Sequence, residues 1–153
     1  MKTKTFLLSL TVFCLAAIVC LASPQMGTWK LNEAKSKTPA GVGKNITVVY
    51  AADGDNVKVT IDGTDDKGKP THNTWTGKFD GKDYPVTGDP GSDTRSYKTV
   101  NDRTLDFTVK KGGATTITGQ IVVAEDGKSR TVTSTGKDDK GKEIKTVAVY
   151  DKA

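Results

Sequence analysis

The sequence predicts an all-β protein, an antiparallel up-and-down β-barrel of about ten strands with little helix. Three observations predict it. Apolar and polar residues alternate with a period of two in short runs rich in β-branched residues, as in half-buried strands. Turns containing Gly separate these runs. No connection is long enough for the helical crossover that parallel strands need. Because closing such a meander removes its two free edges, we favour a barrel over a sandwich.

Residues 1–22 have the layout of a secretory signal peptide. Two lysines give a positive start, residues 6–21 are almost entirely apolar, and Cys20 and Ala22 place small residues before a cleavage site. The apolar run is shorter than the roughly 20 residues of a membrane-spanning helix, which argues against an uncleaved anchor. We therefore expect a single domain at 23–153, export to the periplasm or the extracellular space, and no membrane span after cleavage.

Composition excludes several classes of function. Both cysteines, Cys14 and Cys20, lie in the predicted signal, so residues 23–153 have no thiol for a disulfide, a thiolate metal site or a nucleophile. The formal net charge is +5, and Lys and Asp are mixed along the chain. Nucleic-acid binding needs a clustered basic stripe with stacking aromatic residues, which the sequence lacks. We expect a soluble monomer that binds no nucleic acid.

The first half of the chain is predicted to supply five strands. The first follows the signal and contains Trp29, and the second and third alternate regularly on either side of a turn at 51–56. Pro85 places the fifth strand at an edge or in an irregular position, because proline cannot donate to the ladder. The expected strands are residues 26–31, 46–50, 57–62, 71–79 and 84–86.

The second half supplies five more strands after a longer loop. Residues 88–91, Gly-Asp-Pro-Gly, are the densest cluster of turn-forming residues and mark that loop. Gly119 predicts a bend or bulge inside the eighth strand. The expected strands are residues 94–100, 104–109, 115–124, 130–135 and 143–150.

Helix is predicted only between the first two strands. Residues 32–37 can form one or two turns with Asn32 as the N-cap, and Pro39 stops them.

One turn motif occurs twice. Residues 63–69 read Gly-Thr-Asp-Asp-Lys-Gly-Lys and residues 136–142 read Gly-Lys-Asp-Asp-Lys-Gly-Lys. A hairpin turn used twice explains the repeat, since Asp accepts backbone hydrogen bonds and Gly adopts positive φ. A loose Asp-based cation site is the alternative, although neither copy has the EF-hand pattern.

The register facing the barrel interior is apolar, which is typical both of a ligand pocket and of a packed core. It contains Ile46, Val48, Tyr50, Val57, Val59, Ile61, Trp75, Phe79, Leu105, Phe107, Val109, Ile117, Ile121, Val123 and Val132.

Five residues are candidates for ligand binding. Trp75, Tyr97, Phe107 and Tyr150 would line the pocket. Placing Tyr97 inward also places Arg95 and Thr99 inward, and a buried Arg needs an anionic partner such as a ligand carboxylate. The alternative is that Arg95 lies near the rim and extends to solvent. Trp29 is predicted to be a structural plug at one end of the barrel.

The sequence gives no support for an enzyme. His72 is the only histidine and shares a polar register with Thr74 and Thr76, so we expect it on the surface. Too few His and Cys residues are present for a zinc site, and no Gly-x-Ser-x-Gly motif occurs. We predict no catalytic residues, no metal and no cofactor.

The two ends of the chain resemble those of the calycin superfamily, the lipocalins and fatty-acid-binding proteins. Gly27-Thr28-Trp29-Lys30-Leu31 carries the likeness at the start, and Val147-Ala148-Val149-Tyr150-Asp151-Lys152 carries it at the end. The chain looks like a secreted bacterial lipocalin-like protein. The resemblance implies an antiparallel barrel that binds a small hydrophobic molecule.

Three departures from that family limit what the resemblance implies. Residues 32–44 are too short for the helix-turn-helix lid of fatty-acid-binding proteins. Ala148 stands where their last strand has an Arg two residues before the Tyr that matches Tyr150. The helix that usually follows a lipocalin barrel has no counterpart before Ala153.

The sequence thus favours an exported barrel that binds a small hydrophobic or amphipathic ligand in its lumen. The alternative is a packed barrel that acts through its surface as an envelope interaction or inhibitory module. A continuous apolar cavity of about 300 Å3 or more in the barrel distinguishes the two.

Overall fold

The all-β prediction is confirmed by the computed structural model, which describes residues 23–138 and 140–153. The predicted signal peptide, residues 1–22, lies outside this range. The described part of the chain forms ten strands and one short 3-10 helix, η1 (Glu33–Lys35). The strands are β1 (Gly27–Leu31), β2 (Lys44–Asp53), β3 (Asn56–Thr64), β4 (Pro70–Gly77), β5 (Tyr84–Thr87), β6 (Thr94–Asn101), β7 (Thr104–Lys111), β8 (Ala114–Val123), β9 (Ser129–Lys137) and β10 (Glu143–Lys152). No helix among these residues is long and apolar enough to cross a membrane.

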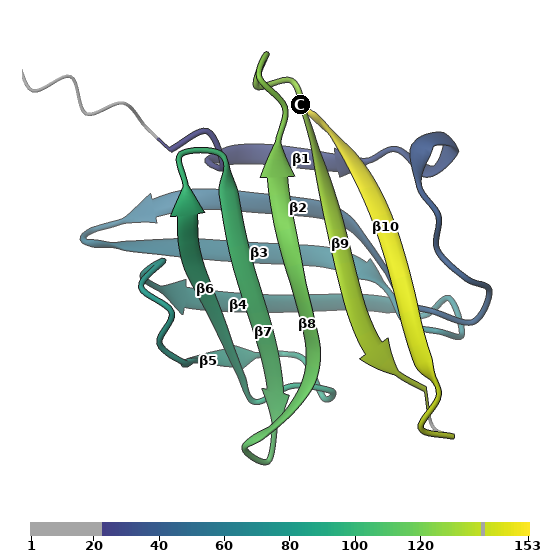
Figure 1. Ribbon diagram of the computed structural model, residues 1–153. Helices are drawn as coiled ribbons and strands as arrows, with labels where there is room; N and C mark the ends of the chain where they lie inside the picture. The colour runs from purple at the N-terminus through teal and green to yellow at the C-terminus, as the bar shows by residue number, and fades with distance from the viewer. Residues whose placement is uncertain (1–22, 139) are drawn as a thin grey trace, which may run out of the picture.

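The strands form a closed antiparallel barrel. Each strand pairs with the next in sequence, and β1 pairs with both β2 and β10. In Figure 1, β2, β3 and β4 run across the view behind β6–β10, which run steeply in front of them. Because the ladder is continuous around the circumference, the fold is a barrel and not a sandwich.

The weakest part of the wall is β5, as Pro85 predicts. This strand has four residues, and only two pairs join it to each neighbour, Thr74↔Thr87 and Trp75↔Val86 on one side and Tyr84↔Arg95 and Pro85↔Thr94 on the other.

One predicted inward residue, Ile46, is on the outside. The register of β2 against β3 shifts between Asn45 and Thr47, so Ile46 has no partner, and the residue is 44% exposed. Gly63 lies opposite this bulge, where a Cβ atom would clash with the Lys44 carbonyl oxygen. The prediction was wrong because regular alternation cannot pass through a bulge.

Thr99, also predicted inward, is exposed. The register of β6 against β7 shifts between Thr99 and Asn101, at the end of β6. The Thr99 hydroxyl donates to the Phe79 carbonyl oxygen at 3.4 Å on the barrel surface.

Gly119 is a site of close approach and not a bulge. The nearby register shift leaves Thr116 of β8 without a partner, because Val109 pairs with Ile117 and Lys110 pairs with Thr115. A Cβ atom on Gly119 would lie 2.5 Å from the Phe107 ring, which covers this glycine across the strand pair. Gly119 is therefore required for the position of Phe107.

The core is a cluster of aromatic and aliphatic side chains inside the barrel. The Trp75 ring lies 4.8 Å from Tyr97 and 5.6 Å from Tyr84 in edge-to-face geometry, and Tyr50 lies 6.2 Å from Tyr97. Such pairs add to the stability gained from burying the rings.

The two Asp-rich turns have the same hydrogen bonds. In the first, the Asp65 carboxylate accepts from the backbone N–H groups of Lys67 and Lys69. In the second, Asp138 accepts in the same way from Lys140 and Lys142. This identity agrees with a hairpin turn used twice.

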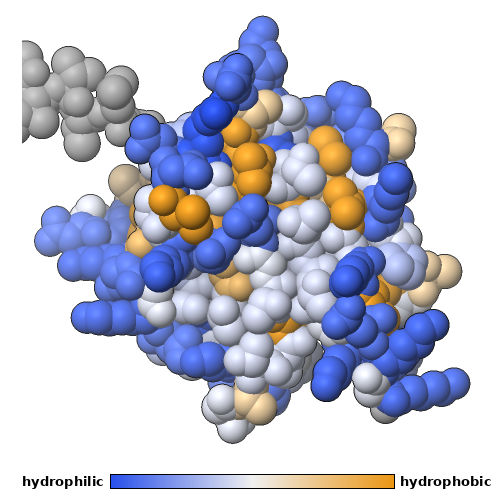
Figure 2. Space-filling model, viewed as in Figure 1, coloured by the Kyte–Doolittle hydropathy of each residue, from blue (hydrophilic) through white to orange (hydrophobic). Residues whose placement is uncertain are grey.

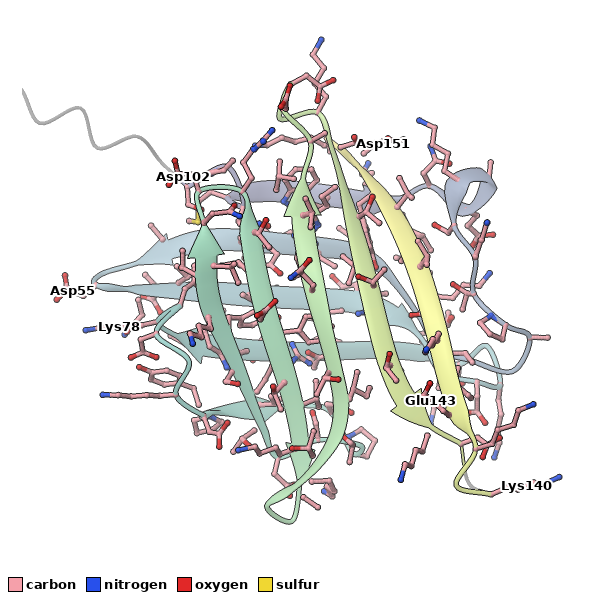
Figure 3. The ribbon with its side chains drawn as sticks, viewed as in Figure 1. Asp55, Lys78, Asp102, Lys140, Glu143 and Asp151 are labelled. Carbon is pink, nitrogen blue, oxygen red and sulfur yellow. The ribbon has the colours of Figure 1, made fainter. Side chains whose placement is uncertain are left out.

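Charged residues gather at the margins of the barrel wall. Figure 3 shows its labelled charged side chains, such as Asp55, Asp102 and Lys140, on turns or strand ends and pointing away from the barrel. The wall seen in Figure 2 is pale at its centre and blue around its edge, with a few hydrophobic groups between. The outer wall in this view is therefore an ordinary mixed surface, and we look for a binding site in the barrel interior.

Candidate functional site

The barrel encloses a cavity of about 260 Å3. It is bounded by strands from all sides of the barrel and, at one end, by residues that precede β2, including Val42 and Gly43. This volume lies just below the range of about 300–1,000 Å3 that is typical of small-molecule sites. Side chains therefore fill the lumen only in part, and the remaining space suits a small ligand.

Apolar side chains supply most of the side walls of the cavity. Val48 and Ile61 line one wall, and Phe107, Val109 and Ile121 line the opposite one. The wall formed by β9 and β10 is mixed, because the hydroxyl groups of Ser134 and Thr146 lie there, 2.6 Å apart.

Four of the five candidate residues line this cavity, namely Arg95, Tyr97, Phe107 and Tyr150. Trp75 lies one layer behind it. The Trp75 indole N–H donates to the Arg95 carbonyl oxygen at 2.7 Å, and its ring packs against Tyr97. Trp75 therefore supports two lining residues. A binding role for the five stays a prediction.

Arg95 is inside the barrel and does not extend to solvent, contrary to the rim alternative. Its side chain is 7% exposed. Nη2 lies 3.3 Å from Asn73 Oδ1 and 3.9 Å from Asp89 Oδ2, whereas Nη1 is buried without a hydrogen-bond partner. Asp89 is held in place by the Gly91 N–H and the Ser92 hydroxyl, both of which donate to its carboxylate. The charge of Arg95 thus has an acidic neighbour.

Tyr150 uses its hydroxyl within the protein. The hydroxyl donates to the Asn45 carbonyl oxygen at 2.9 Å and so connects β10 to the start of β2 across the cavity. Burial raises the pKa of Tyr150 to about 12. Because the Tyr150 hydroxyl already donates its proton to Asn45, it can only accept a further hydrogen bond. It is therefore unsuited to donate a hydrogen bond to an acidic ligand.

Arg130 is a lining residue that sequence reasoning missed. Its side chain comes from β9, and the residue is 2% exposed. Its Cζ lies 4.8 Å from the Trp29 ring centroid, 4.8 Å from Tyr50 and 5.1 Å from Tyr150. Nε and Nη1 are buried and have no hydrogen-bond partner. The sequence contains a signal for it, because Arg130 lies two residues before Val132 and so shares its inward-facing register.

Below Arg130, the barrel is closed by Gln25 and Trp29, which we call the floor. Trp29 is fully buried, and its indole N–H donates to the Gln25 carbonyl oxygen at 2.8 Å. The Gln25 side-chain amide in turn donates to the Arg103 carbonyl oxygen at 3.0 Å. The Lys152 ammonium lies 5.1 Å from the Trp29 ring centroid.

No protein-family model matches the chain, and no curated protein matches it in sequence. Among solved structures it is similar to EF1p2_mFAP2b, determined bound to DFHBI, with a TM-score of 0.50 and 12% sequence identity. The match covers 85% of this chain and 94% of that one. At this identity the likeness concerns the fold alone.

His72 lies apart from the cavity. It is exposed on the outer wall, where Nδ1 lies 2.6 Å from the Asp62 carboxylate on the neighbouring strand. An acid–base role at the barrel mouth would have required His72 to be buried there beside a carboxylate.

Proposed function

We propose that this chain is an exported protein whose barrel binds a small amphipathic ligand in its lumen. The observation that carries the proposal is the cavity of about 260 Å3, which combines apolar side walls with two buried arginines. An apolar pocket with a few fixed polar groups is the usual form of a small-molecule site. Export rests on the sequence of residues 1–22.

Size limits the ligand. At roughly 30 Å3 for each water in the liquid, the cavity holds the volume of about nine waters. A ligand of about ten non-hydrogen atoms suits this space better than a long-chain lipid does. The alternative, a packed barrel that acts only through its surface, requires a lumen filled by side chains.

Filling the cavity tests the proposal. Ala148 lines the cavity, so Ala148→Phe should occupy the lumen, whereas Ala52→Phe on the exposed end of β2 should leave it open. Native mass spectrometry of the purified protein should detect a bound small molecule in wild type and Ala52→Phe and none in Ala148→Phe. Calorimetry with octanoate and 1-octanol checks ligand-free protein. The absence of a co-purified molecule together with no binding of either probe would refute the proposal.

A further inference from the structure

The wall formed by β9 and β10 carries a pair of hydroxyl groups, those of Ser134 and Thr146. The two residues pair directly across the strands, and their hydroxyl oxygens lie 2.6 Å apart. Both residues line the cavity and are only partly buried. Val132 and Ala148, which flank them along the two strands, also line the cavity and are apolar. The hydroxyl pair is therefore a polar site with apolar neighbours.

The hydroxyl pair keeps hydrogen-bonding capacity that the barrel does not use. Each hydroxyl has one proton and two lone pairs, and the bond between Ser134 and Thr146 uses one of the two protons. Within the described part of the chain, neither hydroxyl makes a second hydrogen bond. One O–H donor and several lone pairs therefore remain for a ligand in the cavity.

The two buried arginines are less suited to hold a polar ligand group. Arg130 Nε and Nη1 and Arg95 Nη1 are fully buried, so a ligand in the cavity does not reach them. Each two-nitrogen fork of Arg130 includes one of its buried atoms, so this residue cannot bind a carboxylate through two N–H groups. Arg95 Nη2 donates to Asn73 and lies near the Asp89 carboxylate.

We propose, building on the ligand-binding function above, that Ser134 and Thr146 bind an uncharged hydroxyl group of the ligand, which is an alcohol or a phenol. A ligand hydroxyl accepts from the free O–H and donates to a free lone pair, so both sides are satisfied. A carboxylate only accepts, and it would give up its hydration for a single donor.

The neighbouring strands place an apolar surface beside the hydroxyl pair. Gly119 of β8 pairs with Ser134 and with Phe107 of β7, and the Phe107 ring covers this glycine. The apolar part of the ligand therefore lies against the Phe107 ring.

The test is calorimetric titration of the processed protein with p-cresol and with p-xylene, in which a methyl group replaces the hydroxyl. The double variant Ser134→Ala/Thr146→Val removes both hydroxyls and keeps nearly the same side-chain volume. It should bind p-cresol about tenfold more weakly than wild type does, the factor that corresponds to one hydrogen bond. Its binding of p-xylene should not weaken, which also shows that the variant folds.

Thr133→Val is the matched control, because Thr133 precedes Ser134 in β9 but is exposed and does not line the cavity. It should bind p-cresol as wild type does. Thr146→Ser, which keeps the hydroxyl, should also retain p-cresol binding. Wild type should bind p-toluate, which has a carboxylate in place of the hydroxyl, more weakly than p-cresol.

The results separate this inference from the proposed function. Binding of p-cresol that persists in the double variant, or that falls together with binding of p-xylene, overturns the role of the hydroxyl pair and leaves lumen binding intact. Tighter binding of p-toluate than of p-cresol by wild type overturns the uncharged class of ligand. Failure of wild type to bind p-cresol also overturns the inference, and if octanoate and 1-octanol fail as well, the proposed function is refuted too.

Discussion

Tyr150 illustrates how one buried side chain makes the whole barrel sensitive to alkali. Burial raises its pKa to about 12, and burial is also the main cause of the raised pKa of Tyr50. In the unfolded chain a tyrosine ionises near pH 10. Since the folded pKa is above the unfolded one, the stabilising contribution is complete below about pH 10 and is lost as the pH rises toward 12.

Tyr150→Phe should therefore change the pH dependence of stability and not only its size. At neutral pH the variant should be about 1 kcal/mol less stable, because the hydrogen bond to Asn45 is lost. Between pH 10 and 12 its free energy of unfolding should fall less steeply than that of wild type. Urea unfolding at a series of pH values measures both effects. Parallel curves for the two proteins would contradict the assignment of the alkaline slope to Tyr150.

The sequence predicts Arg95 as an inward residue but does not single out Arg130. Alternation with Tyr97 places Arg95 inward. Arg130 shares a register with Val132 in the same way, but the guanidinium gains significance only from the rings of Trp29, Tyr50 and Tyr150, which come from β1, β2 and β10. Pattern within one strand cannot reveal such a meeting of distant strands.

The connection between β1 and β2, residues 32–43, acts as a strap on β10. β1 pairs with β10 only at residues 150–152, so the rest of that edge needs other partners. The Ser36 hydroxyl accepts from the Val149 N–H at 2.9 Å, and Lys37 forms a bridge with Val147. Because the strap continues into residues that line the cavity, it also covers one end of the site.

Ser36→Ala should loosen this strap. The Val149 N–H loses its acceptor, which costs about 1–3 kcal/mol if the group stays buried. Hydrogen exchange of residues 143–153 should become faster, and a bound ligand should dissociate faster, while the remaining strands keep their protection. Lys35→Ala is the control, since the Lys35 side chain is exposed and forms only a 3.8 Å ion pair with Asp151. Equal exchange in the two variants would show that the strap does not depend on Ser36.

The strands were predictable because turn residues delimit them, and the observed bounds differ from the expected ones by only a few residues. The N-cap at Asn32 was also predictable, and its side chain accepts from the Lys35 N–H. The bulge at Ile46 was not, because it depends on how β2 pairs with β3. The path of the strap was hidden for a similar reason, since Ser36 and Val149 are 113 residues apart in sequence.

For the whole molecule, one end of the barrel is sealed and the other is covered by the strap. The seal begins with Gln25, three residues after the predicted cleavage site. Gln25 is buried, and it provides the backbone acceptor for the Trp29 indole and contacts Arg103 through its side chain. Accurate removal of residues 1–22 would leave this seal intact, whereas trimming beyond Gln25 would open it.

Shortening the protein at its first residues tests this dependence. In a background of residues 23–153, a version that begins at Met26 loses the Gln25 carbonyl and leaves the buried Trp29 N–H unpaired, so it should be about 2 kcal/mol less stable. Gln25→Ala keeps that carbonyl and loses the buried side chain with its bond to Arg103, so it should lose less stability than the shortened version, which lacks both. Urea unfolding, followed by tryptophan fluorescence, measures both.

Because the cavity adjoins the floor through Arg130, the shortened version should also bind octanoate more weakly than Gln25→Ala does. Equal stability of the shortened and full versions would mean that Trp29 closes the barrel without Gln25.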